Sequence, residues 1–351
     1  MSNFKVTLAA VIAVVLSTAA AGAQTVTRPI PDITDCSKPS AADSFFCDSP
    51  TLRAAEAAVA RLALSARNAG PMWWSVIDPH ESWKIARRGP QNSFEDRLAV
   101  YATQAQRLDE ITRGTKALLS NTFSREALRQ DCVVLPNLSF VTFVRSCQVK
   151  EVVGVAPGLI AQRQIWNGAG GPDAMDSYLR FSSAVLILEY DGTEADGGSS
   201  ADDAGWKPVA WADELEGELG VPVLSESKHG TFITVPRIGG GSGAESKDVV
   251  VRQADRHRWI EVDAASWRTE VERRIPRPLI ALGNAPLDLA NLAAELNLLR
   301  PNDPRCCPTG GKAEVRLALR DDVLVVDGIT FRQGTRPSSP AASSRPGAIR
   351  R

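Results

Sequence analysis

Six cysteines are the residues of this chain whose type and spacing most clearly predict chemistry. They fall as three neighbouring pairs: Cys36 with Cys47, Cys132 with Cys147, and Cys306 next to Cys307. In an oxidising compartment such thiols are expected to form disulfides, and pairing of near neighbours is the simplest connectivity. A bridge that closes the loop from Cys36 to Cys47 would stabilise the fold by about 3 kcal/mol in the chain-entropy model.

The adjacent pair lies in DPRCCPTGGKAEV (303–315). A vicinal disulfide between Cys306 and Cys307 would make a rigid turn before the last predicted hairpin. A redox role is the alternative, because strained bridges are more easily reduced, although thiol oxidoreductases carry Cys-x-x-Cys instead. The sequence contains no paired Cys or His half-sites with the spacing of structural zinc, so we expect no metal site.

Enzymatic chemistry has few candidates in the sequence. A hydrolase could use His229 or His257 with an acid such as Asp263, but "SKHGTF" and "ADRHRW" are typical of exposed turns. The glycine run GGGSG (239–243) lacks the strand–loop–helix context and the lysine of a phosphate-binding loop. Neither a G-x-S-x-G elbow nor H-E-x-x-H occurs. We therefore expect a non-enzymatic protein without a cofactor.

The first residues, MSNFKVTLAAVIAVVLSTAAAGAQT, have the composition of a signal peptide. Lys5 supplies the positive charge, residues 6–16 are almost wholly apolar, and Ala-Gly-Ala (21–23) precedes a cut after Ala23. An uncleaved anchor is the alternative, but a membrane helix needs about 20 apolar residues. We expect a periplasmic or secreted protein, and its net charge of −1 predicts no attraction to nucleic acid or anionic membranes.

Two amphipathic helices are predicted in the N-terminal part, residues 24–115. Asp48 or Ser49 can cap a helix that begins at Pro50. Its apolar stripe stops at Asn-Ala-Gly-Pro (68–71), and a second stripe ends near Gly114. The stripes contain Leu52, Ala55, Val59, Leu62 and Ala66, then Phe94, Leu98, Tyr101, Ala105, Leu108 and Thr112. We predict a small helical hairpin or three-helix unit, held at its entrance by Cys36 and Cys47.

Aromatic residues between the two stripes are candidates for a binding patch. Trp73, Trp74, His80 and Trp83 lie in a loop-like segment, and tryptophan is enriched among residues that dominate binding energy. The alternative is that these rings cover the core of the helical unit.

Residues 32–114 resemble the lysozyme-inhibitor LprI-like family. The resemblance is carried by "DC…FFCDSPTLRAAEAAVARL", by the tryptophan segment "SWKIARR" and by the closing helix "VYATQAQRLDEI". The family's second cysteine pair is absent, since ARRGPQNSFEDRLAVY contains no cysteine. The resemblance implies an envelope protein that binds and blocks a lysozyme or another wall hydrolase. Charge adds little, because these residues contain ten Lys and Arg against eleven Asp and Glu.

From about residue 130 the sequence changes to β-branched runs separated by Gly, Pro and Asp. We predict strands within 147–166, 177–192, 220–241 and 248–263, and helices over Ala264–Arg274 and Pro286–Leu299. The last hairpin should turn at Asp321-Asp322, with a strand over 323–331. GTEADGGSSADDAG (192–205) is expected to be an exposed loop, and the arginine-containing tail, 333–351, is expected to be disordered.

Together these features predict an α+β protein, in which a small disulfide-stapled helical module precedes a larger, mainly antiparallel α+β domain over 130–332. The expected function is that of an exported, non-enzymatic envelope binding protein. The alternative is a structural or accessory periplasmic protein whose α+β domain binds an unknown ligand.

Overall fold

The computed structural model describes residues 36–37, 44–72, 76, 80, 83, 87, 93–136, 144–168, 181–191, 205–214, 217–238, 248–283, 285–304 and 306–334. The expectations for the signal peptide (1–23), Trp73, Trp74, most of the loop 192–205, the glycine run 239–243 and the tail from 335 lie outside the described residues.

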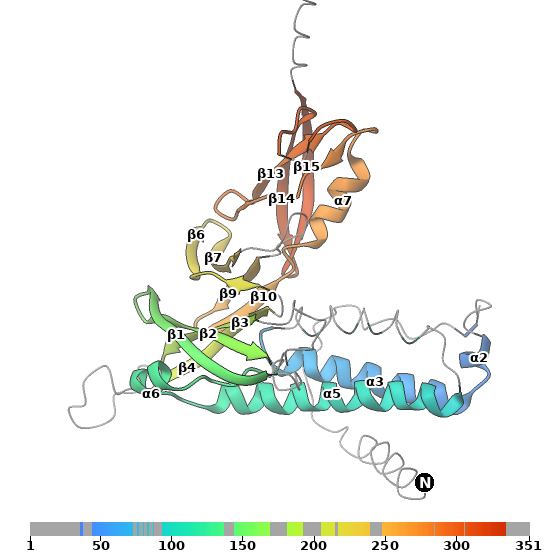
Figure 1. Ribbon diagram of the computed structural model, residues 1–351, viewed down its shortest axis with the longest axis vertical. Coiled ribbons are helices and arrows are strands. Elements are labelled where there is room, and N and C mark those ends of the chain that lie inside the picture. Colours follow the sequence, from blue (N-terminus) through green and yellow to red (C-terminus); the bar gives the residue numbers. More distant parts are fainter. Residues whose placement is uncertain are drawn as a thin grey trace, which may run out of the picture.

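The described chain is an α+β protein in which helices precede antiparallel sheets, so the predicted fold class is confirmed (Figure 1). The first helices are α2 (Ser44–Cys47), α3 (Pro50–Ala69), α5 (Phe94–Ser120) and α6 (Arg125–Gln130). Sheet 1 contains β1 (Val144–Ala156), β2 (Leu159–Gly168), β3 (Phe181–Tyr190) and β4 (Trp206–Glu214), in that order. A short pair, β5 (Glu218–Leu219) with β8 (Arg237–Ile238), follows.

Two more sheets and a helix complete the described fold. Sheet 2 has the order β10 (Arg258–Val262), β9 (Val249–Asp255), β7 (Gly230–Val235) and β6 (Val223–Ser227). Helix α7 (Ser266–Arg274) precedes sheet 3, which has the order β11 (Ile280–Ala281), β13 (Ala293–Leu299), β14 (Gly311–Arg320) and β15 (Val323–Gln333). Strand β12 (Leu287–Asp288) pairs with β13.

Helix α3 begins where the sequence predicts. The Ser49 hydroxyl accepts a hydrogen bond from the Leu52 amide at 3.3 Å, and Pro50 is the first helical residue. This combination satisfies one of the free amides at the helix start and uses a residue that has no amide to satisfy.

Helix α5 does not end near Gly114, as predicted, but continues to Ser120. A glycine in a helix costs about 1 kcal/mol relative to alanine, and packing can override that cost. Here the added turns bury Thr115 and Leu118, and Leu118 joins the core beneath sheet 1. The predicted module boundary at residue 115 therefore falls inside a helix.

Helices α3 and α5 run in the same direction. Phe46, just before α3, stacks on Tyr101 near the start of α5, with ring centroids 6.4 Å apart. At the other end, a Cβ on Gly70 would come within 2.5 Å of the Thr115 methyl and 3.3 Å of Leu119. Because matching ends of the two helices touch, the chain between them must return along their length.

Described residues of this returning segment lie on one face of a helix. Val76, His80 and Trp83 are helical, and the Arg87 amide donates to the Trp83 carbonyl at 2.8 Å. His80 contacts Gln104, whereas Arg87 reaches the start of α5, so the segment runs antiparallel to α5. Of the two predicted arrangements, the structure has the three-helix unit: α3, the returning segment and α5.

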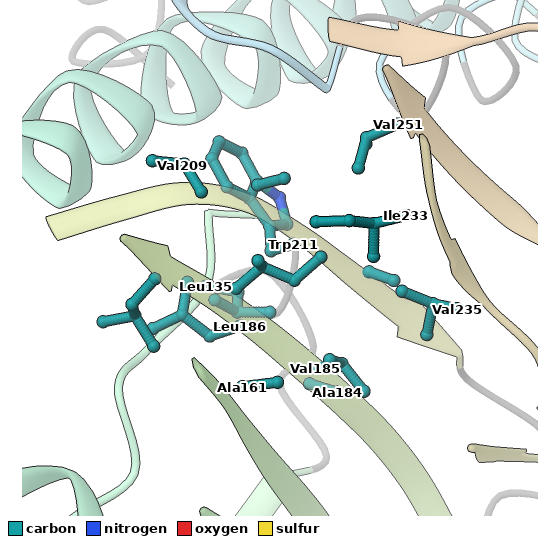
Figure 2. Packing of buried hydrophobic residues seen from close by; sticks show 14 of the residues in the cluster. Leu135, Ala161, Ala184, Val185, Leu186, Val209, Trp211, Ile233, Val235 and Val251 are labelled. Carbon is teal, nitrogen blue, oxygen red and sulfur yellow. The ribbon is translucent and has the colours of Figure 1, made fainter. Parts of the chain in front are cut away.

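Sheets 1 and 2 face each other as a sandwich. Strand β4 lies near β10 and β1 lies near β6. Their shared core includes Ala161 and Val185 of sheet 1 and Ile233, Val235 and Val251 of sheet 2 (Figure 2). Two sheets that pack face to face bury the apolar side chains of their facing surfaces between them.

Sheet 2 also buries its second face. Phe232 and Val250, the neighbours of Ile233 and Val251, belong to another core together with α7 and sheet 3. Since successive side chains of a strand point to opposite faces, the sheet contributes to both cores. Sheet 2 is therefore the central layer of the described β-rich part.

The last predicted hairpin is confirmed. Strands β14 and β15 pair with Arg320 opposite Val323, and Asp321 and Asp322 have φ values of 50° and 59°. Two-residue turns with positive φ at both positions match the twist of a hairpin.

The predicted helix over Ala264–Arg274 is present as α7, but the one over Pro286–Leu299 was wrong. That segment forms β12, a turn and β13. Leu292 has a φ of 48°, which a right-handed helix does not permit. In β13 the buried Leu296 and Leu298 alternate with exposed Asn297, which is the period of a strand.

A buried glutamine joins α6 and the chain after it to the outer face of sheet 1. Gln162 on β2 is fully buried, and its amide nitrogen donates to the carbonyls of Leu128 at 2.5 Å and Asp131 at 2.8 Å. Its amide oxygen accepts from the Val133 amide at 3.3 Å. The disulfide between Cys132 and Cys147 holds the same chain to β1.

We expect Gln162→Met to destabilise the protein by at least about 2 kcal/mol, because the change leaves buried backbone groups without partners. Urea unfolding monitored by tryptophan fluorescence measures the change. The matched control is Gln106→Met on the exposed side of α5, which should change the free energy of unfolding by less than about 0.5 kcal/mol. Equal stability of the two variants would contradict the role given to Gln162.

Candidate functional site

The disulfides predicted for the first two cysteine pairs are present. Cys36 and Cys47 are joined with their Cα atoms 5.4 Å apart, and Cys132 and Cys147 with theirs 6.2 Å apart. The Arg53 guanidinium donates to the Cys47 carbonyl, which ties the first bridge to α3. The chain that enters the three-helix unit is thus fixed at two points.

Cys306 and Cys307 are not bridged, in contrast to the predicted disulfide. Consecutive Cα atoms are about 3.8 Å apart, whereas disulfides usually join Cα atoms at least about 4.4 Å apart. Adjacent cysteines can therefore be joined only with strain. Both thiols are exposed, and a hydrogen bond with Cys306 raises the pKa of Cys307.

Asp303 supplies the stiffness that the predicted bridge would have given to this turn. Its carboxylate accepts from the amides of Arg300 and Thr309, each at 2.7 Å, and from the Thr309 hydroxyl at 2.7 Å. These hydrogen bonds, led by the Arg300 amide, lower the pKa of Asp303. The turn is thus closed by a charge rather than by a covalent bond.

Two of the four candidate binding residues face the interior of the three-helix unit. His80 is 2% exposed, and its ring stacks on half-buried Trp83 with centroids 5.3 Å apart. Trp83 meets the Tyr101 ring edge-on, also at 5.3 Å. The placement of His80 and Trp83 agrees with the interpretation that these rings cover the helical core.

A buried ion pair lies beside these rings and was not predicted. The guanidinium of Arg87 contacts the carboxylate of Glu56, and both side chains are about 95% buried. The same guanidinium lies over the rings of Phe46 and Trp83, 5.7 and 5.5 Å from their centroids, and donates to the Tyr101 hydroxyl at 3.2 Å. Aromatic faces attract a cation at such distances, most strongly away from water.

These contacts define the aromatic–ionic cluster: Phe46, Glu56, His80, Trp83, Arg87, Tyr101 and Gln104. It joins all three elements of the helical unit directly behind the Cys36–Cys47 bridge. A spacing of four, three and four residues from Val76 to Arg87 is the sequence signal that predicts this inward face. Glu56, the ion-pair partner of Arg87, lies 31 residues earlier in the sequence, so this spacing could not predict that the two residues pair.

The candidate catalytic residues are not brought together. His229 lies in the exposed β6–β7 turn, and the Nδ1 atom of His257 is 3.0 Å from the Oε2 atom of Glu189. Asp263 is buried and accepts from the amides of Ala265 and Ser266, each at 2.9 Å. The carboxylate of Asp263 therefore anchors the start of α7 and does not orient either histidine.

Within the described ranges there is no group of three or more His, Cys, Asp or Glu side chains arranged to hold a metal ion. In the same part of the chain, none of the helices combines the length and the apolar character needed to cross a bilayer.

The three-helix unit has an exposed polar surface on the outer face of α5, a helix whose residues are all described. This surface contains Glu95, Asp96, Thr103, Gln106, Asp109, Arg113 and Lys116, all exposed. Arg113 is 2.9 Å from Asp109, while half-buried Arg107 lies in the field of Asp213 on β4 and has a pKa lowered by burial. Carboxylates therefore dominate the charge toward the start of this face.

No protein-family model matches the chain, and no curated protein matches it either.

We expect Arg87→Met to destabilise the three-helix unit by about 3–5 kcal/mol, because the carboxylate of Glu56 is left buried without its partner. The double variant Glu56→Met/Arg87→Met should regain most of that stability, since neither charge of the pair remains buried. Thermal unfolding followed by helical circular dichroism measures both. If the double variant were as unstable as the single one, the ion pair would not explain the loss.

We also expect the stability of the turn that Asp303 closes to depend on pH. Because the folded-state pKa of Asp303 is lowered, the carboxylate favours the folded turn above the ordinary aspartate pKa of about 3.9, and this contribution is lost as pH falls through the folded-state value. The Thr309 amide resonance, followed by NMR during acid titration, should shift with a midpoint below about 3.9. Asp303→Asn should abolish the transition, and a midpoint above 4 would contradict the assignment.

Proposed function

We propose that the protein is exported and acts as a non-enzymatic binding protein of the envelope, with the three-helix unit as its binding part. The proposed target is a lysozyme or another wall hydrolase. The resemblance of residues 32–114 to LprI-like lysozyme inhibitors supports this target, and the two disulfides support an oxidising compartment.

The main observation in support of the proposal is that the three-helix unit projects from the sheets and is cross-linked at its far end. Its α2 end and the first halves of α3 and α5 extend beyond the sheets (Figure 1). The Cys36–Cys47 bridge and the Glu56–Arg87 pair fix this distal end. A rigid element loses little conformational entropy when it binds, so more of its contact energy appears as affinity.

The outer face of α5 carries exposed carboxylates, which favour a positively charged partner. Glu95, Asp96 and Asp109 are exposed there, and many lysozymes are basic. Complementary charge mainly accelerates association and selects the partner. The near-neutral total charge of residues 32–114 does not describe this surface, because the total also counts buried groups such as Arg67 and the Glu56–Arg87 pair.

The test measures lysozyme turnover and complex formation with the mature chain, residues 24–351, at low and moderate salt. Inhibition should depend on dose, and Glu95→Lys/Asp109→Lys should weaken it at least tenfold, mainly through slower association.

The control variant Glu295→Lys/Asp327→Lys changes the net charge by the same amount on exposed residues of sheet 3, far from α5. It should inhibit within threefold of the parent protein. Absence of inhibition together with absence of a complex on a sizing column would overturn the proposal. Equal weakening by both variants would show that total charge, and not the outer face of α5, determines binding.

A further inference from the structure

The exposed pair Cys306 and Cys307 differs from every other described cysteine of the chain. The other four form disulfides, whereas these two remain as thiols next to each other in the turn between β13 and β14. Neither the fold nor the proposed function uses them. Both thiols are exposed, and their adjacency in the sequence keeps the two side chains within reach of each other.

Hydrogen bonds fix the backbone of the turn that carries the two cysteines. The Cys307 amide donates to the Pro304 carbonyl at 2.9 Å, and Asp303 fixes both ends of the turn through Arg300 and Thr309. Such preorganisation lowers the cost of binding a ligand between the sulfur atoms. The same adjacency makes a disulfide between them strained, so the pair is poised to act as two separate sulfur donors.

We propose that Cys306 and Cys307 form a two-sulfur site for a soft metal ion of low coordination number, of which monovalent copper is the type. Soft thiolate ligands favour such ions. Zinc in structural sites takes four protein ligands, and the described residues offer no third one here. Binding replaces both thiol protons by the metal, and the two protons pass to solvent without any change of oxidation state.

The site is distant from the three-helix unit. Strand β14 leaves the cysteine turn and reaches Arg320 at its other end, beside Asp322, which pairs with Arg252 of sheet 2 at 2.5 Å. The cysteines thus lie at the end of sheet 3 that is remote from sheet 2. Metal binding and hydrolase binding can therefore be measured independently.

The experiment uses the mature chain under anaerobic conditions with ascorbate, which keeps copper monovalent and leaves protein disulfides intact. Thiol titration should first find two reactive thiols per chain. In competition with a chromophoric Cu(I) chelator, one copper ion should bind per chain, and Zn(II) should bind at least a hundredfold more weakly. Cys306→Ser and Cys307→Ser should each reduce Cu(I) affinity at least a hundredfold.

Cys36–Cys47 and Cys132–Cys147 remain bridged in these variants, so unchanged thermal unfolding will exclude misfolding as the cause of lost binding. Three results would overturn the proposal: a chain isolated without free thiols, Cu(I) affinity unchanged in either serine variant, or tighter binding of Zn(II) than of Cu(I).

Discussion

The guanidinium of Arg87 imposes the main constraint on the N-terminal part of the molecule. A buried cation must be paired and surrounded, and here Glu56, two aromatic faces and a tyrosine hydroxyl do so. These groups come from α3, from the returning segment and from α5. The charge can therefore be buried only when all three elements are in place, which makes the arrangement of the unit specific.

The Cys36–Cys47 bridge stabilises the same end of the three-helix unit, next to the aromatic–ionic cluster. It holds the chain that carries Phe46 against the cluster, and Phe46 in turn covers both Arg87 and Tyr101. A disulfide restricts the unfolded chain, whereas the ion pair selects the folded arrangement. The two devices are complementary, and together they explain how a small helical unit stays ordered at its far end.

How far the sequence predicts this fold depends on the range of the interaction that decides each element. Ser49 and Pro50 determine the start of α3, and Asp321-Asp322 determines a hairpin, because only neighbouring residues are involved. The segment Pro286–Leu299 fits a helix or a strand equally well by composition, and its positive-φ residue Leu292 gave no local signal. The parallel direction of α3 and α5 is seen only in contacts between residues distant in sequence, such as Phe46 with Tyr101 and Gly70 with Thr115.

The candidate sites also divide into those decided by neighbouring residues and those decided by residues distant in sequence. The sequence predicted two of the three cysteine pairs, since local pairing needs only spacing and an oxidising compartment. The spacing of Val76, His80, Trp83 and Arg87 places His80 on one face of a helix, but the sequence alone left open whether that face is buried or binds a partner, because this depends on what packs against it. Cys306 and Cys307 departed from the prediction for a local reason, namely that adjacent Cα atoms are too close for an unstrained bridge.

The three-helix unit is also not an independent module, although its far end is free. At its base, Met72 and Leu118 enter the core of sheet 1, and the Glu261 amide of β10 donates to the Pro71 carbonyl at 2.9 Å. A Cβ on Gly70 would come within 3.4 Å of the Trp211 ring, so helix and sheet approach closely. The three-helix unit and sheet 1 are therefore packed against each other through a shared core. This packing gives one physical reason for the presence of both parts in a single chain.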